Sequence, residues 1–215
     1  MKKLTIIIVI ITLLTLGIMT GIDMGIENME TKVEAQSRVH TVQSGDSLWK
    51  IAVRYQAGLS EIISVNKHIK NPDLIYPGQK ITIPEAPPYK AMEDEIIRLV
   101  NIERQNRGLG RLSYDWQVAR VARIKSQDMI ENNYFSHTSP VYGSPFNMLK
   151  AFNIRYTTAA ENIAYGQRSA REVVNSWMNS PGHRQNILNT NVTKIGVGIA
   201  KNYNGVLYFT QMFIR

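Results

Sequence analysis

The 215-residue sequence contains no cysteine. This absence excludes disulfide bonds, thiolate metal sites and cysteine nucleophiles. A chain without disulfides can still fold outside the cytoplasm if its core is large enough. The sequence also lacks a run of five or more lysine or arginine residues, which excludes a basic tail. Hydrophobic residues make up 44% of the chain and charged residues 20%, as is typical of a globular protein.

The net charge of +8 is unevenly distributed. Residues 92–215 hold 15 basic and 9 acidic side chains, a net charge of +6 for this part alone. A basic domain attracts polyanions. No nucleic-acid recognition pattern is present, so nucleic acid is not expected as a partner. The N-terminal segment described next favours anionic wall polymers or lipid headgroups instead.

Residues 4–22 carry no charged side chain and follow Lys2 and Lys3. As a helix this stretch would span roughly 28 Å, close to the hydrocarbon core of a bilayer. A positive start and an apolar run are also typical of a secretory signal peptide, with Val33-Glu34-Ala35 as a cleavage site. Residues 1–36 are therefore predicted to be a signal peptide or a membrane anchor. In both cases the rest of the chain is expected to be extracytoplasmic.

Residues 39–84 predict a small module with the order strand, helix, helix, strand. Val39, Thr41 and Gln43 alternate with their neighbours as in a strand, and Ser47 can cap a helix from Leu48 to Tyr55. A second helix is expected from Ser60, and the segment 80–84 closes the module as a strand.

Two blocks in this module, HTVQSGDSLWKIAVRY (40–55) and NPDLIYPGQKITIP (71–84), resemble a LysM domain over its full length. The resemblance implies binding of N-acetylglucosamine-containing glycans, such as peptidoglycan, in a shallow groove between two loops. Backbone amides of a glycine-containing turn can bond acetamido groups, while apolar side chains cover the sugar face. The implied glycan-binding residues are Gly45, Asp46, Ser47, Leu48, Pro72, Asp73, Leu74 and Ile75.

A simpler interpretation of the same residues stays open. Gly45 can be only a turn residue, and Leu48, Leu74 and Ile75 can be only core. Trp49 and the tyrosine at the end of the first helix are expected to be core residues rather than stacking platforms.

A proline-rich linker at 85–91 precedes a second domain at 92–215. Helices are predicted from Met92 to Arg107, from Asp115 to Glu131, from Phe146 to Phe152 and, after the capping box Ser169 to Glu172, up to Ser180. Two strands at 195–199 and 206–214 finish the chain, joined by a turn at Asn204-Gly205. In the first of these strands every second residue is glycine, so another layer can approach its bare face closely. The predicted fold class is α+β: a βααβ module joined to an αβα sandwich.

Four segments of the second domain, taken in order, resemble the CAP superfamily of cysteine-rich secretory, antigen 5 and pathogenesis-related (SCP-like) proteins, and most closely its bacterial branch. These segments are YFSHTSP (134–140), AENIA (160–164), SWMNSPGHRQNIL (176–188) and IGVGIA (195–200). The resemblance implies that His137, Glu161 and His183 lie together in the central cleft of the CAP fold.

Two imidazoles and a carboxylate can bind a divalent metal such as zinc, with His137 and His183 as ligands, or act as acid and base near neutral pH. Animal members carry a second cleft glutamate where this sequence has Ser180. That departure puts both metal binding and catalysis in doubt. A structural interpretation also stays open: Glu161 would then pair with Arg184 or Arg155, and His183 would bond the backbone.

The sequence thus predicts an exported protein of the cell wall or spore envelope. Its LysM domain binds peptidoglycan, and its CAP domain has a binding role. The alternative is a hydrolase, metal-dependent or not, that acts on wall peptide or glycan through His137, Glu161 and His183. A weaker alternative is a lipid-binding module. Membrane contact is expected only through residues 4–22, if they are not cleaved.

Overall fold

The computed structural model describes residues 38–215. The predicted leader or anchor at 1–36 lies outside the described residues. Within 38–215, no helix combines the length and the apolar character needed to cross a membrane.

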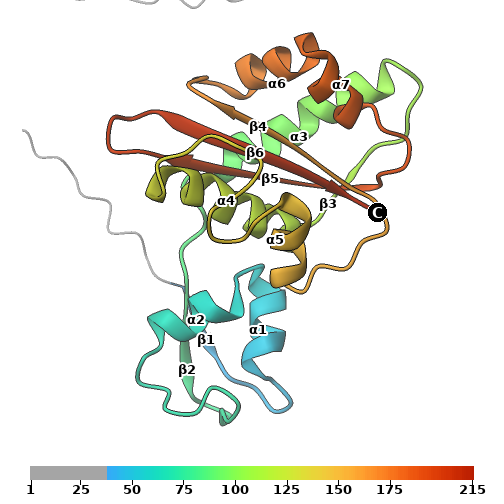
Figure 1. Cartoon of the computed structure of the whole chain (residues 1–215). Helices are drawn as coiled ribbons and strands as arrows, with labels where there is room; N and C mark the ends of the chain where they lie inside the picture. The colour runs from blue at the N-terminus through green and yellow to red at the C-terminus, as the bar shows by residue number, and fades with distance from the viewer. Residues whose placement is uncertain (1–37) are drawn as a thin grey trace, which may run out of the picture. The chain divides into compact units, whose positions relative to one another are not determined.

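The N-terminal module has the predicted order of elements (Figure 1): β1 (Arg38–Thr41), α1 (Leu48–Tyr55), α2 (Leu59–Val65) and β2 (Lys80–Ile83). The two strands pair antiparallel, with Val39 opposite Thr82. Both helices bury one face against this ribbon. The resulting core consists of Val42, Leu48, Ile51, Ala52, Ile62, Ile81 and Ile83.

Two polar side chains stabilise this small module. The Ser47 hydroxyl caps α1 by accepting a hydrogen bond from the amide of Lys50 at 3.2 Å. The buried Asn66 amide donates to the carbonyls of Ile62 and Thr82, each at 2.7 Å, and its oxygen accepts from the amide of Thr82 at 2.8 Å. Asn66 therefore ties α2 to β2 with bonds that a buried amide needs to satisfy.

The prediction that Trp49 is a core residue is wrong. Its side chain lies on the outer face of α1 and is 51% exposed. On this helix Leu48, Ile51 and Ala52 turn inward, and Trp49 stands one position off that face, about 100° around the helix from Leu48.

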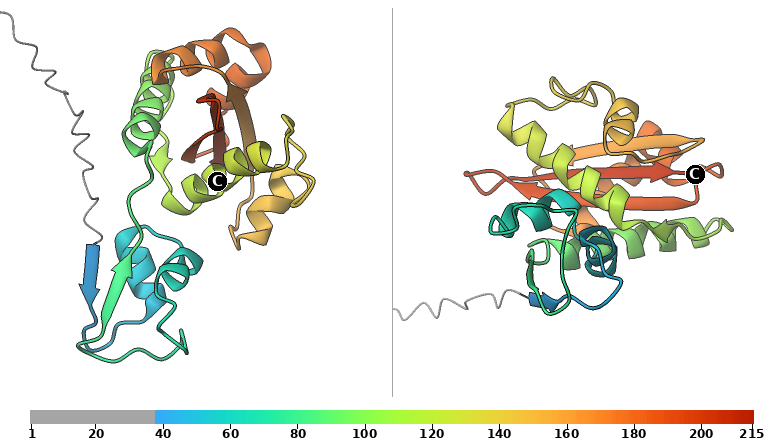
Figure 2. Two further views of the ribbon diagram at one scale, coloured as in Figure 1. Left: turned by 90° about the vertical axis from the view of Figure 1, so that its left-hand side faces the viewer. Right: turned by 90° about the horizontal axis from the view of Figure 1, so that it is seen from below.

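The C-terminal domain consists of α3 (Lys90–Gln105), β3 (Ser113–Tyr114), α4 (Trp116–Glu131), α5 (Pro145–Ala151), β4 (Ala159–Tyr165), α6 (Ala170–Asn179), α7 (Pro181–Ile187), β5 (Lys194–Lys201) and β6 (Leu207–Ile214). The sheet has the order β3-β5-β6-β4, with β3 parallel to β5 and the other pairs antiparallel. Helices cover both faces of the sheet (Figure 2), so the predicted αβα sandwich is confirmed.

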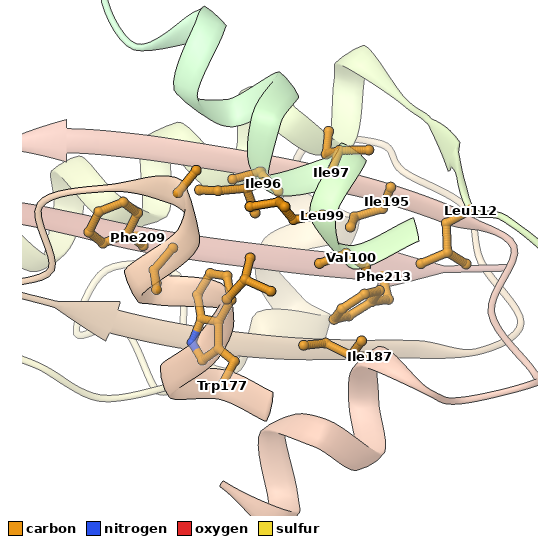
Figure 3. Packing of buried hydrophobic residues seen from close by; sticks show 14 of the residues in the cluster. Ile96, Ile97, Leu99, Val100, Leu112, Trp177, Ile187, Ile195, Phe209 and Phe213 are labelled. Atoms are coloured by element: carbon orange, nitrogen blue, oxygen red, sulfur yellow. The ribbon is translucent and has the colours of Figure 1, made fainter. Parts of the chain in front are cut away.

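The two faces of the sheet bury separate apolar clusters. On one face α3 and α6 enclose Trp177, Phe209 and Phe213, as Figure 3 shows. On the other face α4 and α5 pack against β6, where Met212 is fully buried. Strand β6 is central and buried on both sides, as its uncharged alternating sequence predicts.

The glycines of β5 let α4 lie directly against the sheet. A Cβ atom at Gly196 would stand 2.2 Å from the backbone nitrogen of Ala119, and one at Gly198 would stand 2.0 Å from that of Arg123. No side chain fits in this space. The close approach predicted from the alternating glycines is confirmed.

A buried ion pair joins α3, α4 and β5. Glu93 lies in the first turn of α3 and accepts hydrogen bonds from two nitrogens of the Arg123 guanidinium, the closest pair of atoms being 2.6 Å apart. The same carboxylate accepts the amide of Ile199 at 3.2 Å. With its partners all in place, this charge is tolerated in the interior.

Three elements of this domain were not predicted from the sequence. Strand β4 contains Glu161 and Asn162, whose polarity masks a strand, and β3 is only two residues long. Helix α7 begins at Pro181-Gly182, where the sequence pattern predicts only the end of a helix. Proline is equally suited to the first position of a helix, and this is the role it has here.

We expect Gly198→Ala to destabilise the domain by about 1–3 kcal/mol or more, because the new methyl group would collide with the α4 backbone. Urea unfolding followed by circular dichroism measures this change. Gly110→Ala is the matched control, since a Cβ there meets nothing within 4 Å. Equal stability of the two variants would contradict the close packing of α4 on β5.

Candidate functional site

Glu161 and His137 form a hydrogen-bonded pair at the edge of the sheet. Glu161 lies in the middle of β4, the edge strand, and its Oε1 is 2.7 Å from Nδ1 of His137 in the segment after α4. The glutamate side chain is 2% exposed, whereas the imidazole is half exposed. The hydrogen bond to the half-exposed His137 therefore connects the buried Glu161 carboxyl group to solvent.

Burial raises the pKa of Glu161 above its ordinary value of 4.5. The hydrogen bond from His137 and the positive charge of Lys125 oppose this shift, but they do not cancel the cost of desolvating the carboxylate. The second oxygen, Oε2, is buried and has no hydrogen-bond partner within the described residues. The protein interior thus favours the protonated form of Glu161 over the ionised form more strongly than water does.

His183 reaches the same site from α7. Burial lowers the pKa of His183, and the positive charge of His137 lowers it further. The side chain of Asn162, the residue after Glu161 on β4, donates to the backbone carbonyl of His183 at 3.1 Å, so α7 begins beside the strand of Glu161. The fold therefore brings together the three residues predicted from the sequence, from a loop, an edge strand and a short helix.

Buried amides hold α7 against β4. The Asn162 side chain donates to the carbonyl of His183 at 3.1 Å and to Gln211 at 2.9 Å. The Asn186 side chain donates to the backbone carbonyl of Glu161 at 3.1 Å and to the Asn162 oxygen at 2.9 Å. The bond from Asn186 also satisfies the Glu161 carbonyl, which an edge strand would otherwise leave open.

A fully buried lysine, which is not among the residues predicted from the sequence, fixes the loop that carries His137. The Lys125 ammonium on α4 donates to the carbonyls of Ser136 and His137 at 2.8 and 3.1 Å, and to the Tyr134 hydroxyl at 2.8 Å. Burial lowers the pKa of Lys125, while the charges of Glu161 and Asp128 raise it. Lys125 is a positioning residue for His137.

The signal for Lys125 was present in the sequence. It interrupts the inward face of α4 between Ala122 and Met129, where an apolar residue is expected. A lysine at such a position needs internal partners. Tyr134 supplies one of them and in turn donates its hydroxyl hydrogen to Asp128.

The residues at this site do not converge on a common point as metal ligands. Nδ1 of His137 is already bonded to Glu161. Within residues 38–215, no group of three or more His, Cys, Asp and Glu side chains is arranged to hold a metal ion. Binding of a divalent metal by His137 and His183 alone stays a prediction.

Glu161 does not pair with an arginine in the described part of the chain. Its partner is His137, and Arg184 instead donates to the carbonyl of Met178 at 3.1 Å. Ser180 ends α6 and precedes α7, and it brings no carboxylate to the site.

The predicted capping box at the start of α6 is present in outline. The Ser169 hydroxyl accepts a hydrogen bond from the amide of Glu172 at 3.2 Å. The Glu172 carboxylate in turn accepts the amide of Arg168 at 2.9 Å. Glu172 is therefore occupied at the helix terminus and does not replace the missing second glutamate.

In the N-terminal module, the two predicted glycan-binding loops differ in what they expose. Gly45, Asp73 and Leu74 are exposed, and Leu74 retains 51% of its surface. Leu48 lies in the core instead, so it can support the groove only from inside. Ile75 of the second loop is partly buried and packs against the same core cluster that contains Leu48. The remaining predicted positions, Ser47 and Pro72, are partly buried.

Asp46 organises the first loop. Its carboxylate accepts the amide of Gln43 at 2.9 Å, the ring of His40 at 2.8 Å and the Arg54 guanidinium at 3.1 Å. The bonds from Gln43 and His40 lower the pKa of Asp46 to about 2. The carboxylate therefore remains charged and saturated with internal bonds, which leaves it a structural role.

The comparison with known families agrees with this architecture. The model of the cysteine-rich secretory protein family (CAP) matches residues 97–213, which is more than half of the chain. The chain belongs to this family. The LysM domain model matches residues 40–84.

Three relatives illustrate the likeness. An uncharacterized protein of Bacillus subtilis, YkwD, is 53% identical over 58% of this chain and 47% of its own length. SpoIVD-associated factor A of Bacillus subtilis is 51% identical over 47 residues, 22% of this chain and 12% of its own. A crystal structure of an extracellular SCP-domain protein from Bacillus anthracis has 36% identity and a TM-score of 0.54, and the match covers 64% of this chain and 47% of that protein. The chain spans less than half the length of these relatives.

We expect Glu161→Gln to stabilise the protein at neutral pH. Because burial raises the pKa of Glu161, the folded state binds more protons than the unfolded state above pH 4.5. The stability associated with the neutral carboxyl group is complete below pH 4.5 and is lost as pH rises through the folded pKa. Glutamine does not ionise, so the Glu161→Gln variant keeps this stability at neutral pH.

Thermal unfolding between about pH 4 and pH 8 measures this effect. The Tm advantage of the variant should be largest at the high end and should shrink toward zero below about pH 4.5. Glu85→Gln, at an exposed linker carboxylate, is the control and should show no such trend. A wild-type protein that is more stable than Glu161→Gln at neutral pH would contradict the assignment.

Proposed function

We propose that the LysM domain attaches this protein to N-acetylglucosamine-containing glycan of the cell wall or spore envelope, where the CAP domain binds a further ligand without catalysis. The observation that carries the proposal is that both predicted loops contribute a side chain to the LysM core, Leu48 and Ile75, and leave Gly45, Asp73 and Leu74 exposed. An exposed apolar side chain and an exposed glycine-containing turn suit a sugar with acetamido substituents.

The internal bonds of Asp46 support this proposal. Its carboxylate fixes the first loop before any ligand arrives. A preformed loop reduces the entropy lost on binding, which matters for a shallow groove with few contacts. Asp46 thus contributes to affinity by organising the loop rather than by touching the glycan.

The relatives support an extracytoplasmic location. LysM and CAP modules occur together in this chain, the SCP-domain neighbour from Bacillus anthracis is described as extracellular, and the segment shared with SpoIVD-associated factor A has the length of the LysM module. We therefore assign this protein to the wall or the spore envelope. The +6 charge of residues 92–215 adds attraction to anionic wall polymers there.

The chemistry of the cleft supports a binding role for the CAP domain. Glu161 is the one carboxylate that the described residues bring to the His137–His183 site, and Ser180 stands where animal relatives carry a second glutamate. A glycosidase of the usual kind needs two carboxylates across the scissile bond. Two imidazoles and a protonated carboxyl group can instead donate and accept hydrogen bonds to a polar ligand.

Leu74→Ala in the full chain should reduce retention on purified peptidoglycan several-fold, because the exposed apolar side chain would no longer cover the sugar face. Co-sedimentation measures the retained fraction. Val65→Ala, which truncates an exposed residue on α2, is the matched control and should be retained like wild type. If Leu74→Ala and wild type sediment alike, or if wild type is not retained, the LysM part of the proposal fails.

A second candidate function is hydrolysis of wall peptide or glycan. The raised pKa of Glu161 and its contact with His137 favour it, since a protonated carboxyl group beside an imidazole can act as a general acid. As water attacks the scissile bond, the half-exposed His137 would protonate the leaving group, and the buried Glu161 carboxyl would return a proton to His137. The proton released by the attacking water would pass to solvent.

Incubation of purified peptidoglycan with the full chain separates the two functions. Our proposal expects no release of soluble fragments above buffer by wild type or by Glu161→Gln. Release by wild type but not by Glu161→Gln would replace the binding role with the hydrolase. The glutamine variant is informative because it is expected to be at least as stable as wild type, so lost release would not reflect unfolding.

A further inference from the structure

Three aromatic rings form a continuous patch beside the His137–Glu161 pair, which we name the aromatic shelf: Phe135, Tyr165 and Tyr208. Phe135 meets Tyr165 edge-on with ring centroids 4.7 Å apart, and Tyr165 stacks on Tyr208 at 5.6 Å. Phe135 is 45% exposed and Tyr165 is 53% exposed. The shelf therefore presents ring surface to solvent from a loop and two neighbouring strands.

The shelf is continuous with the candidate site. Residues two apart on a strand share a face, so Tyr165 stands on the same face of β4 as Glu161. Four residues of strand separate them by about 13 Å. At its other end, Phe135 belongs to the loop that Lys125 fixes through Ser136 and His137. A ligand of several rings can therefore touch the shelf and the His137–Glu161 pair at once.

Internal packing accounts for only part of this arrangement. The Tyr165–Tyr208 contact joins paired positions of β4 and β6 and stabilises the sheet. It does not require Phe135, which contributes an exposed ring from a separate segment. Neighbouring exposed aromatics of this kind mark binding surfaces more often than isolated ones do.

The chemistry of the shelf matches a saccharide. The hydroxyl groups of Tyr165 and Tyr208 form no side-chain hydrogen bond within residues 38–215, and no cation lies over any of the three rings there. Pyranose rings have an apolar C–H face, which packs on the negative face of an aromatic ring, and a hydroxyl rim, which phenol groups can bond.

We infer that the aromatic shelf binds pyranose rings of a glycan strand that continues past the His137–Glu161 pair. The proposed function leaves the ligand of the CAP domain unnamed, and this inference gives its chemical class. The inference rests on the proposed function, in which the protein is attached to a glycan surface. The chain then contacts its glycan at two places, the LysM groove and the shelf.

Fluorine NMR of the full chain labelled with fluorotyrosine tests the inference, because tyrosines report on each surface separately. Tyr165 and Tyr208 report on the shelf, and the exposed Tyr76 follows Leu74 and Ile75 in the LysM loop. Tyr203, which is 95% exposed between β5 and β6, is the matched control. Tyrosine-to-phenylalanine variants assign these signals among the 10 tyrosines.

The probes are the tetramer of N-acetylglucosamine and solubilised peptidoglycan fragments. We expect saturable shifts of the Tyr165 and Tyr208 signals with at least one of the two probes, and no shift of Tyr203. The shelf signals should still respond in Leu74→Ala. Phe135→Ala and Tyr165→Ala should each weaken the shelf response about three- to tenfold, as is usual for the loss of one aromatic contact.

The outcomes distinguish the inference from the proposed function. Shifts of Tyr76 without shifts of Tyr165 and Tyr208 would overturn the shelf and leave the LysM function standing. Shifts of the shelf alone would support the inference while the LysM proposal fails. Shelf signals that respond to anionic phospholipid vesicles and to neither glycan probe would overturn the choice of a saccharide. Thermal unfolding of the two alanine variants verifies that they are folded.

Discussion

The direct contact between α4 and the backbone of β5 is the constraint on which the CAP domain depends. Because Gly196 and Gly198 present no side chain, the helix lies against the sheet itself. Ser126 strengthens this contact by donating to the carbonyl of Gly198 at 3.0 Å. The neighbouring Lys125 is thereby held in the interior, and its ammonium holds the loop of His137. The position of the His137 loop therefore depends on Gly196 and Gly198, which lie on a different strand from Glu161.

The pKa values at the site of His137, Glu161 and His183 are set by competition between desolvation and charge. Glu161 is surrounded by groups that favour its ionised form, yet burial outweighs them and raises its pKa. Burial likewise favours the neutral form of His183 by lowering its pKa. Both shifts favour the neutral forms of these side chains relative to water. The aromatic shelf adds ring faces beside these hydrogen-bonding groups.

The LysM domain achieves its order by different means. Its core is small, so apolar burial alone gives limited stability, and hydrogen bonds of polar side chains add to it. Asn66 joins a helix to a strand, and Asp46 closes a loop with bonds to His40 before it and Arg54 after it. Residues that order the loops are thus distinct from those that face outward, such as Leu74. This division explains why a motif residue in a binding loop need not touch the ligand.

The amino-acid sequence by itself determined the two modules and most of their helices, and it indicated the neighbourhood of His137 and Glu161. Helical periodicity, caps such as Ser169 and the bare glycine face act locally along the chain, so they can be recognised without the fold. The strand that carries Glu161 could not be recognised in this way, because polar residues on an edge strand break the alternation that marks a strand. The same holds for α7, where Pro181 begins a helix that follows the end of another.

Only the tertiary structure decided what those residues do. It turned Leu48 inward and Trp49 outward, gave Glu161 a histidine partner rather than an arginine, and made Lys125 an internal support of the cleft loop. It also assembled the aromatic shelf, whose residues are far apart in the chain, into one surface. The physical reason is that burial, pKa and ring contacts depend on neighbours from other segments, and a linear pattern does not contain those neighbours.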